Sequence, residues 1–198
     1  MRGYPIVISS PSGGGKTTLV HRILADMPKA AYSVSVTTRP PRTGERNGRD
    51  YFFVSKPAFE RMVRKHELAE WAGVHSHLYG TPKKFLDAKI TLGYFPILDV
   101  DVQGALQLKK KYPAGVYIFL IPPTLRELAR RLRERHTDSP EVIKKRLQAA
   151  KRELAVAQKY DYVVLNDDLD AAVERVKTIL EAERWRAHRA DARLKALR

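Results

Sequence analysis

The 198-residue chain contains no cysteine and no long apolar run. Without thiols it can form no disulfide, no thiolate nucleophile and no cysteine-based metal site. None of its apolar stretches approaches the roughly 20 residues that a membrane-spanning helix needs. Residues 1–5 lead straight into an apolar segment and leave no space for a signal peptide. We therefore expect a cytoplasmic protein with no membrane partner.

Acidic residues are scarce relative to basic ones. The chain has 22 Asp and Glu but 37 Lys and Arg, a formal net charge of +15. Such an excess suits polyanions, namely nucleotides, nucleic acid or an acidic membrane surface, and much of it can also be a solvated face. Nucleic-acid binding that rests on charge alone is weak, salt-dependent and indifferent to sequence. We expect no specific nucleic-acid partner.

A glycine-rich turn follows the first apolar run. Residues 10–17 read Ser-Pro-Ser-Gly-Gly-Gly-Lys-Thr, which is the layout of a phosphate-binding loop between a strand and a helix. Glycines let backbone N–H groups turn inward around an anion, and the following helix points its N-terminus at the same place. Lys16 would reach the β- and γ-phosphates, and the Thr17 hydroxyl would hold Mg²⁺. The predicted triphosphate-binding residues are Ser12, Gly13, Gly14, Gly15, Lys16, Thr17 and Thr18.

This loop departs from the usual motif at one position, because Ser10 stands where the first glycine belongs. Serine can serve there if its backbone keeps a negative φ angle. We expect the loop to bind a nucleoside triphosphate despite this change.

Strand patterns and helix patterns alternate along most of the chain. Strands are predicted at 6–9, 31–36, 95–100, 116–121 and 162–165, and helices at 16–26, 82–90, 102–111, 125–135, 141–158 and from 170 onward. Thr81 before Pro82 is a predicted helix cap, and Pro96 is awkward inside a central strand. The alternation predicts an α/β fold, a parallel sheet with helices on both faces, as in P-loop NTPases.

Two segments break the alternation. Residues 33–82 hold short strand patterns and polar turns, which predict a small mixed lobe, and residues 126–146 are rich in arginine, which predicts a helical lid over the nucleotide. We expect a single domain with its core at 1–32, 83–125 and 147–185, followed by a basic helical tail at 186–198.

Several separated motifs resemble those of guanylate kinases. They are the phosphate loop, Ser35-x-Thr37-Thr38-Arg39-x-x-Arg42-x-Gly44-Glu45, Gly48-x-Asp50-Tyr51-x-Phe53-Val54, Glu70-Trp71, Tyr79-Gly80-Thr81, Asp99-Val100-Asp101-Val102-Gln103-Gly104 and Asn166-Asp167-Asp168-Leu169. The resemblance runs in the family's order from about residue 5 to about residue 185. It implies an enzyme of purine nucleotide metabolism and GMP recycling that transfers the γ-phosphoryl group of MgATP to GMP or dGMP.

The resemblance also implies a GMP site. Its residues are Ser35, Arg39, Arg42, Tyr51, Glu70, Tyr79, Gly80, Thr81, Asp99 and Asp101. The two arginines and two tyrosines of this set would hold the GMP phosphate, since guanidinium forks suit a phosphate dianion. Glu70 would read guanine, because a carboxylate accepts from N1–H and N2–H₂, while Ser35 and Thr81 donate to O6.

Asp99 and Asp101 follow a predicted strand at its carboxyl end, where open α/β sheets place ligand-binding groups. The resemblance makes Asp99 a holder of Mg²⁺ through water and Asp101 a second contact near the base. Asp101 also suits a helix N-cap.

On the ATP side, the resemblance places Arg131 and Asn166 near the adenine and closes Arg135 and Arg146 on the γ-phosphate. The implied catalytic residues are Lys16, Arg39, Arg135 and Arg146. A phosphate oxygen of GMP is already anionic at pH 7, so no general base is assigned.

Alternatives remain at this point. A guanylate-kinase-like scaffold would bind phosphorylated peptides without chemistry, and a P-loop kinase acting on a ribose phosphate would not need Glu70. A nucleic-acid binder rests on net charge alone, and a homo-oligomer is open. His75 and His77 lack a third ligand for a metal.

Overall fold

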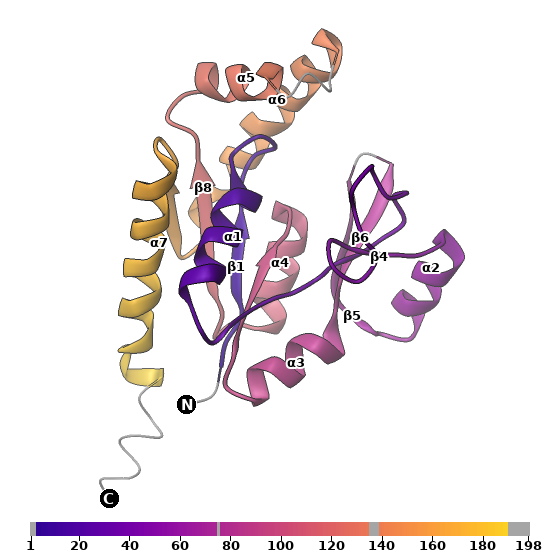
Figure 1. The fold of residues 1–198 in the computed structure, drawn as a ribbon, viewed down its shortest axis with the longest axis vertical. Coiled ribbons are helices and arrows are strands. Elements are labelled where there is room, and N and C mark those ends of the chain that lie inside the picture. Colours follow the sequence, from indigo (N-terminus) through magenta and orange to yellow (C-terminus); the bar gives the residue numbers. More distant parts are fainter. Residues whose placement is uncertain (1–2, 75, 135–138, 190–198) are drawn as a thin grey trace, which may run out of the picture. The chain divides into compact units, whose positions relative to one another are not determined.

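The computed structural model describes residues 3–74, 76–134 and 139–189 (Figure 1). Its main sheet has five strands in the order β2-β7-β1-β8-β9, and a second sheet has four strands in the order β4-β3-β6-β5. β2 pairs with β7, and β8 with β9, in parallel register. The α/β fold with a parallel sheet, predicted from the alternation, is confirmed. Within the described ranges, no helix is long and apolar enough to cross a bilayer.

The chain divides into two compact units. The first unit contains Ile8–Pro28 and Val116–Arg198, and the second contains Arg2–Val7 and Lys29–Gly115. The phosphate loop lies in the first unit, whereas every residue predicted to bind GMP lies in the second.

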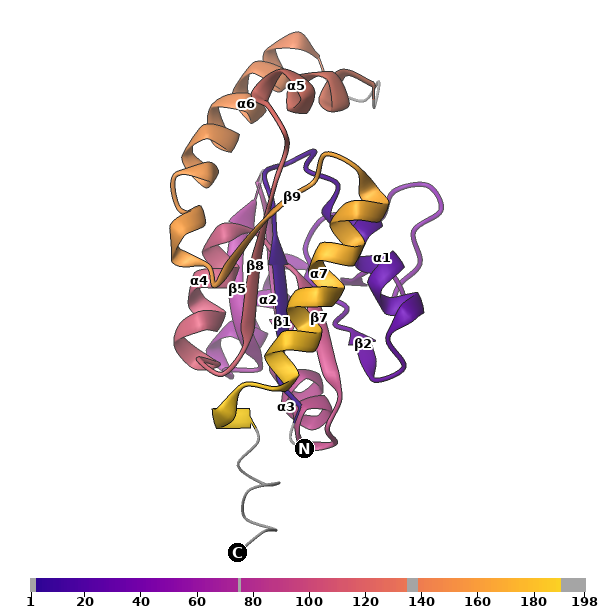
Figure 2. The ribbon, with the colours of Figure 1, turned by 90° about the vertical axis from the view of Figure 1, so that its left-hand side faces the viewer.

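The first unit contains the helix that follows the phosphate loop and the helices of the C-terminal part of the chain. Its elements are β1 (Ile6–Ser9, shared with the second unit), α1 (Lys16–Asp26), β8 (Val116–Ile121), α5 (Leu125–Glu134), α6 (Pro140–Leu154), η1 (Ala157–Lys159), β9 (Tyr162–Leu165), α7 (Leu169–Arg184) and η2 (Ala187–Arg189). α1 and α7 lie side by side (Figure 2). Leu19 and Ile23 of α1 and Val176 of α7 are fully buried, so apolar residues at helical spacing dock both helices.

The second unit contains the four-stranded sheet and three helices. Its elements are β2 (Ala30–Tyr32), β3 (Val36–Thr37), β4 (Phe52–Phe53), α2 (Lys56–Arg64), β5 (Leu68–Val74), β6 (His77–Pro82), α3 (Lys83–Thr91), β7 (Phe95–Asp99) and α4 (Val102–Lys111). Val36, Phe59 and Leu68 form a buried cluster between this sheet and α2.

One predicted strand is wrong. The segment 31–36 forms two strands, β2 and β3, which belong to different sheets. The Ser33 N–H donates to the carbonyl of Ile97 at 2.9 Å, whereas the Ser35 carbonyl accepts from the N–H of Phe52 at 2.8 Å. The backbone therefore changes sheets within three residues.

Pro96 lies in β7, as predicted. The neighbouring residues make the bonds to β2, because Phe95 N–H donates to Lys29 at 2.8 Å and Ile97 accepts from Ser33. Residues of a parallel strand turn to alternate sides, so the missing N–H of Pro96 costs no bond to β2.

Two side chains of α4 bond to the backbone of β5, an edge strand of the four-stranded sheet. The Gln107 amide donates to the Trp71 carbonyl at 2.7 Å and accepts from its N–H at 3.3 Å. Lys111 Nζ donates to the Ala69 carbonyl at 2.6 Å. These bonds satisfy backbone groups that no neighbouring strand reaches.

Candidate active site

The phosphate loop turns through two glycines with left-handed backbone angles. Gly13 has φ 90° and Gly15 has φ 84°. A Cβ on Gly15 would lie 2.5 Å from Nδ2 of Asn166, and a Cβ on Gly13 would lie 2.9 Å from the side chain of Leu132. Both positions therefore require glycine for backbone angle and for space.

Ser10 fits the loop without strain. Among the described residues other than glycine, only His66 and Ser76 have a positive φ, so the Ser10 backbone stays in the region that serine tolerates. Its hydroxyl donates to the Pro11 carbonyl at 3.1 Å. Ser10 therefore has the negative φ angle that a serine needs at this position.

α1 begins at Lys16, directly after the loop, and has no acidic residue in its first turn. The first N–H groups of the helix lack partners within it, and the helix dipole favours negative charge there. Thr17 and Thr18 occupy the same turn. The predicted phosphate-binding residues thus form one continuous turn at the start of a helix, a geometry suited to an anion.

A cavity of 390 Å³ opens beside the loop. Its lining includes Gly13, Gly15, Thr18, Arg131 and Asn166. The structure therefore brings the two residues predicted near adenine to the predicted phosphate site.

Hydrogen bonds fix both of these side chains. Asn166 is buried, and its Nδ2 donates to the Gly14 carbonyl at 2.6 Å. Arg131 donates through Nη2 to the Asn166 carbonyl at 3.0 Å and through Nε to Glu127 at 2.8 Å. Bonds from Arg130 and Arg131 lower the pKa of Glu127 to about 2, so it stays a carboxylate.

α6 supplies a further arginine to the loop. Nη1 of Arg146 donates to the Ser12 hydroxyl at 3.3 Å. This contact places a guanidinium group against the predicted phosphate site, as expected for a lid arginine. Arg135, the other predicted lid arginine, lies outside the described residues.

The second unit gathers Arg39, Tyr51 and Tyr79. The guanidinium carbon of Arg39 lies 5.3 Å from the centre of the Tyr51 ring, and the two tyrosine rings are 5.9 Å apart. Burial, and next the negative charge of Asp99, raise the pKa of Tyr51 to about 12. The phenol therefore keeps its proton at neutral pH and can donate to an anion.

Glu45 holds this arginine in place. Nη2 of Arg39 donates to Oε1 of Glu45 at 2.7 Å, and the Arg42 N–H donates to Oε2 at 2.7 Å. The bond from Arg39 lowers the pKa of Glu45. Glu45 belongs to a quoted motif, but sequence reasoning gave it no role.

The predicted guanine reader is buried and hydrogen-bonded. Glu70 in β5 is 3% exposed, and its Oε1 accepts from the Thr81 hydroxyl at 2.7 Å. This bond corrects the predicted capping role of Thr81: Pro82 is the cap residue of α3, without a side-chain cap bond. Ser35 is also buried, at the end of the crossing between the two sheets.

Gly104 gives the Glu70 carboxylate its space. A Cβ at this position would lie 2.4 Å from Oε2 of Glu70 and 3.3 Å from Oδ1 of Asp101. Asp101 caps α4, since its Oδ1 accepts from the Gly104 N–H at 2.8 Å. The two predicted base-contacting carboxylates therefore converge on Gly104, a residue of a quoted motif to which the sequence assigned no role.

Asp99 ends β7 and accepts from the Tyr32 hydroxyl at 2.9 Å. Burial, followed by the charge of Asp99, raises the pKa of Tyr32. Sequence reasoning missed Tyr32, because an aromatic residue at the end of a short strand gives no functional signal.

No group of three or more His, Asp or Glu residues stands ready for a metal within the ranges that the structure describes. Thr17 and Asp99 provide oxygen donors of the kind that Mg²⁺ prefers, and that ion usually keeps waters and binds substrate phosphates. Each of these side chains, taken within its own unit, is chemically suited to a magnesium ion carried mainly by a nucleotide. Of the two histidines that lack a third metal ligand in the sequence, His75 lies outside the described residues.

Comparison with known proteins decides the family. The guanylate kinase family model matches residues 2–183.

The chain belongs to the guanylate kinase family.

Relatives of this family match over nearly their whole length. A guanylate kinase of Desulfitobacterium hafniense (strain Y51) is 47% identical over 187 residues, which are 94% of each chain. One from Geobacter metallireducens (strain ATCC 53774 / DSM 7210 / GS-15) is 48% identical and covers 94% of this chain and 92% of its own. The crystal structure of guanylate kinase from Anaplasma phagocytophilum has a TM-score of 0.80 at 33% identity, over 95% of this chain and 89% of that one.

Proposed function

We propose that the two groups of residues bind the two substrates of a guanylate kinase, ATP in the first unit and GMP in the second. The enzyme is an ATP-dependent nucleoside monophosphate kinase. The observation that carries the assignment of the GMP site is the buried Glu70 carboxylate, bonded to Thr81 and given space by Gly104.

Glu70 selects guanine by hydrogen-bond polarity. A carboxylate only accepts, and guanine offers N1–H and N2–H₂ side by side. Adenine lacks this donor pair and would leave the buried carboxylate unpaired, a mismatch that can reduce kcat/KM by about 10⁴–10⁵. Asp101 adds a second acceptor near the base, and the Ser35 hydroxyl donates to O6, since the one hydroxyl proton of Thr81 is already donated to Glu70.

Arg39, Arg42, Tyr51 and Tyr79 hold the GMP phosphate. Arg39 carries five N–H donors, more than Glu45 and Pro40 take up. The Tyr51 phenol, which stays protonated, donates to the same anion. dGMP would use the same contacts, since none of those proposed here involves the ribose 2′-hydroxyl.

The phosphate loop and Lys16 hold the ATP phosphates, while Arg131 and Asn166 line the adenine side. Thr17 and, through water, Asp99 would hold Mg²⁺, which would supply positive charge to neutralise the β- and γ-phosphates. Lys16, Arg39, Arg135 and Arg146 stabilise the charge of the transferring phosphoryl group. No residue removes a proton, because the attacking oxygen is already anionic.

The test is ADP release by the purified protein with MgATP and, in parallel, GMP, dGMP, AMP, UMP or CMP. We expect turnover with GMP and dGMP only, and Lys16→Ala should abolish it while GMP still binds. GMP binding without ADP release would instead indicate a binding module, and turnover with AMP would refute the role of Glu70.

The cellular setting follows from the substrates. We propose that the enzyme works in the cytoplasm, in purine nucleotide metabolism and GMP recycling. Light scattering coupled to size-exclusion chromatography separates a monomer from the homo-oligomer that the sequence left open.

A further inference from the structure

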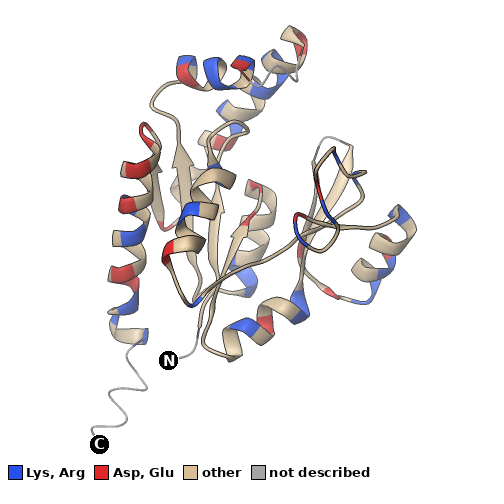
Figure 3. Ribbon diagram, in the orientation of Figure 1, with Lys and Arg blue, Asp and Glu red and all other residues tan. Residues whose placement is uncertain are grey.

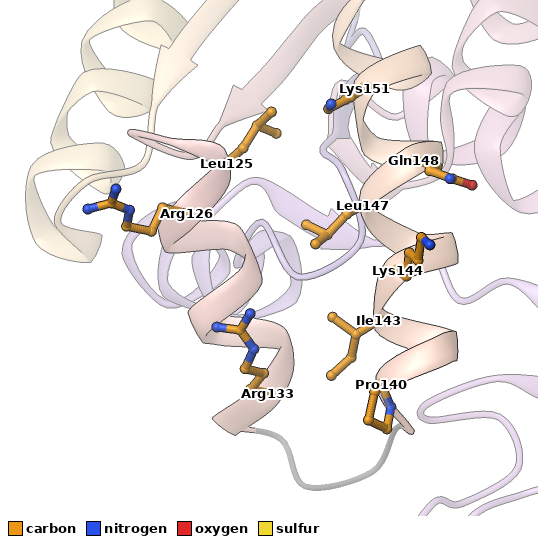
Figure 4. Close-up of a pocket in the computed structure, with 9 residues that line it drawn as sticks. All are labelled: Leu125, Arg126, Arg133, Pro140, Ile143, Lys144, Leu147, Gln148 and Lys151. Atoms are coloured by element: carbon orange, nitrogen blue, oxygen red, sulfur yellow. The ribbon is translucent and has the colours of Figure 1, made fainter.

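A groove of 910 Å³ lies between α5 and α6 in the first unit (Figure 4). Leu125 from α5 and Ile143 and Leu147 from α6 point into the space between the two helices. Leu125 is 38% exposed and Leu147 is partly buried, whereas Ile143 is buried in a cluster with Leu128 and Leu132 of α5.

This groove is separate from the nucleotide-binding face of the same helices. Arg133 is two positions from Arg131 on α5, and Lys144 is two positions from Arg146 on α6. Two positions correspond to about 200° around a helix. The cations Arg133 and Lys144 of the groove therefore face away from the arginines that contact Asn166 and Ser12.

The groove is flanked by positive charge on both sides. Arg126 and Arg133 lie along α5, and Lys144 and Lys151 lie along α6; both helices carry basic residues along their length in Figure 3. All four side chains are exposed, and the structure records no ion pair between any of them and another described residue. In contrast, Arg130 on the same helix α5 pairs with Glu127 and Glu134.

The spacing of these cations is regular. On each helix the two charges are seven residues apart, or about 10 Å along the axis. On α6, the apolar residues Pro140, Ile143 and Leu147 follow a three-four spacing between them. An apolar seam flanked by charges at heptad spacing is the arrangement that receives another helix.

We propose that this groove docks an amphipathic α-helix of an acidic partner protein. The apolar stripe of that helix lies on Leu125 and Leu147, while Ile143 stays buried between α5 and α6. Carboxylates spaced by seven residues on its two flanks pair with the four cations. The heptad spacing on both rims favours a helix over an extended segment, and the net positive rim favours acidic flanks.

The probe is a fluorescein-labelled peptide of about two heptads, with leucines on one stripe, glutamates on both flanks and a lactam bridge on its far face to hold the helix. Fluorescence anisotropy measures its binding to the full-length protein. We expect binding at least about tenfold tighter than that of a scrambled peptide of the same composition. Equal binding of the two peptides would overturn the proposal.

The decisive variant is Lys144→Glu/Lys151→Glu, with both positions exposed and outside the proposed ATP site. It should weaken the acidic peptide at least about tenfold and gain affinity for a peptide with lysine flanks, while ADP release stays unchanged. The matched control is Lys83→Glu/Lys84→Glu, which makes the same change in net charge on α3.

Two controls distinguish binding in the groove from non-specific attraction between opposite charges: the α3 variant and a peptide without leucine. The control variant should bind the acidic peptide within about twofold of the unmodified protein. If it weakens binding as much as the α6 variant, or if replacing the peptide leucines by serine changes nothing, the groove does not dock a helix.

Discussion

Replacing Gly104 by alanine tests the proposed guanine site most directly. The new Cβ would lie 2.4 Å from Oε2 of Glu70, about 1 Å closer than an ordinary contact allows. Glu70 must therefore move by about 1 Å, away from the geometry in which Thr81 donates at 2.7 Å. A misplacement of about 1 Å can cost about 100-fold in rate.

The expected result is a fall of about 100-fold in kcat/KM for GMP with the KM for ATP unchanged. Alanine has the higher helix propensity by about 1 kcal/mol, which offsets part of the packing strain, so the protein should still fold. Steady-state ADP release gives both constants, and a thermal melt checks the fold.

A matched control is available on the strand that carries Glu70. A Cβ on Gly73 would meet nothing within 4 Å, so Gly73→Ala should leave both constants unchanged. If Gly104→Ala also left kcat/KM for GMP unchanged, Glu70 would not bind the base as proposed. An equal rise in both KM values would also contradict the reasoning.

Three further predictions concern the loop and the arginine clamp. Gly15→Ala should raise the Kd for ATP about 100-fold while the Kd for GMP stays unchanged, because the residue has φ 84° and its Cβ would strike Asn166; isothermal titration with each nucleotide measures both constants. Arg39→Ala should raise the KM for GMP about 100-fold and the KM for ATP little, whereas the reverse pattern would mean that the two sites are exchanged. Glu45→Gln should raise the KM for GMP about tenfold, since Arg39 loses a charged partner. The pKa of Glu45 is lowered in the folded protein, so its contribution to stability is present at neutral pH and is lost as the pH falls through that lowered pKa. The difference in melting temperature between the parent protein and Glu45→Gln should therefore be constant above about pH 5 and vanish in acid.

Local patterns predicted the elements next to the phosphate loop with the bounds that the structure has, β1 at Ile6–Ser9 and α1 at Lys16–Asp26. Both depend on neighbours in sequence, namely a buried apolar run and a helix that starts at a glycine turn. The predicted strand at 31–36 failed because an extended chain keeps the same alternation when it leaves one sheet for another. The alternation of apolar and polar residues indicates that a segment is extended, but it does not indicate which strand the segment pairs with.

The candidate site shows the same limit. Motifs located the residues predicted to contact nucleotides, but Glu45, Gly104 and Tyr32 act on those residues through bonds or space that only the fold creates. At Thr81 the local sequence and the tertiary structure favour different roles. Its position before Pro82 favours a helix cap, whereas its hydroxyl donates to the buried Glu70 on the paired strand. A buried carboxylate needs a donor more than an exposed helix end does.

The bonds from Gln107 and Lys111 to β5 have a consequence for how the protein behaves in a crowded solution. An open strand edge is a template on which a strand of another chain can add, and such additions lead to aggregation. Here two side chains of α4 already take up backbone groups of Ala69 and Trp71. α4 therefore protects the edge of β5 from pairing with a strand of another molecule. A substitution of Gln107 that removes these bonds should first lower the solubility of the protein, before it lowers the rate of catalysis.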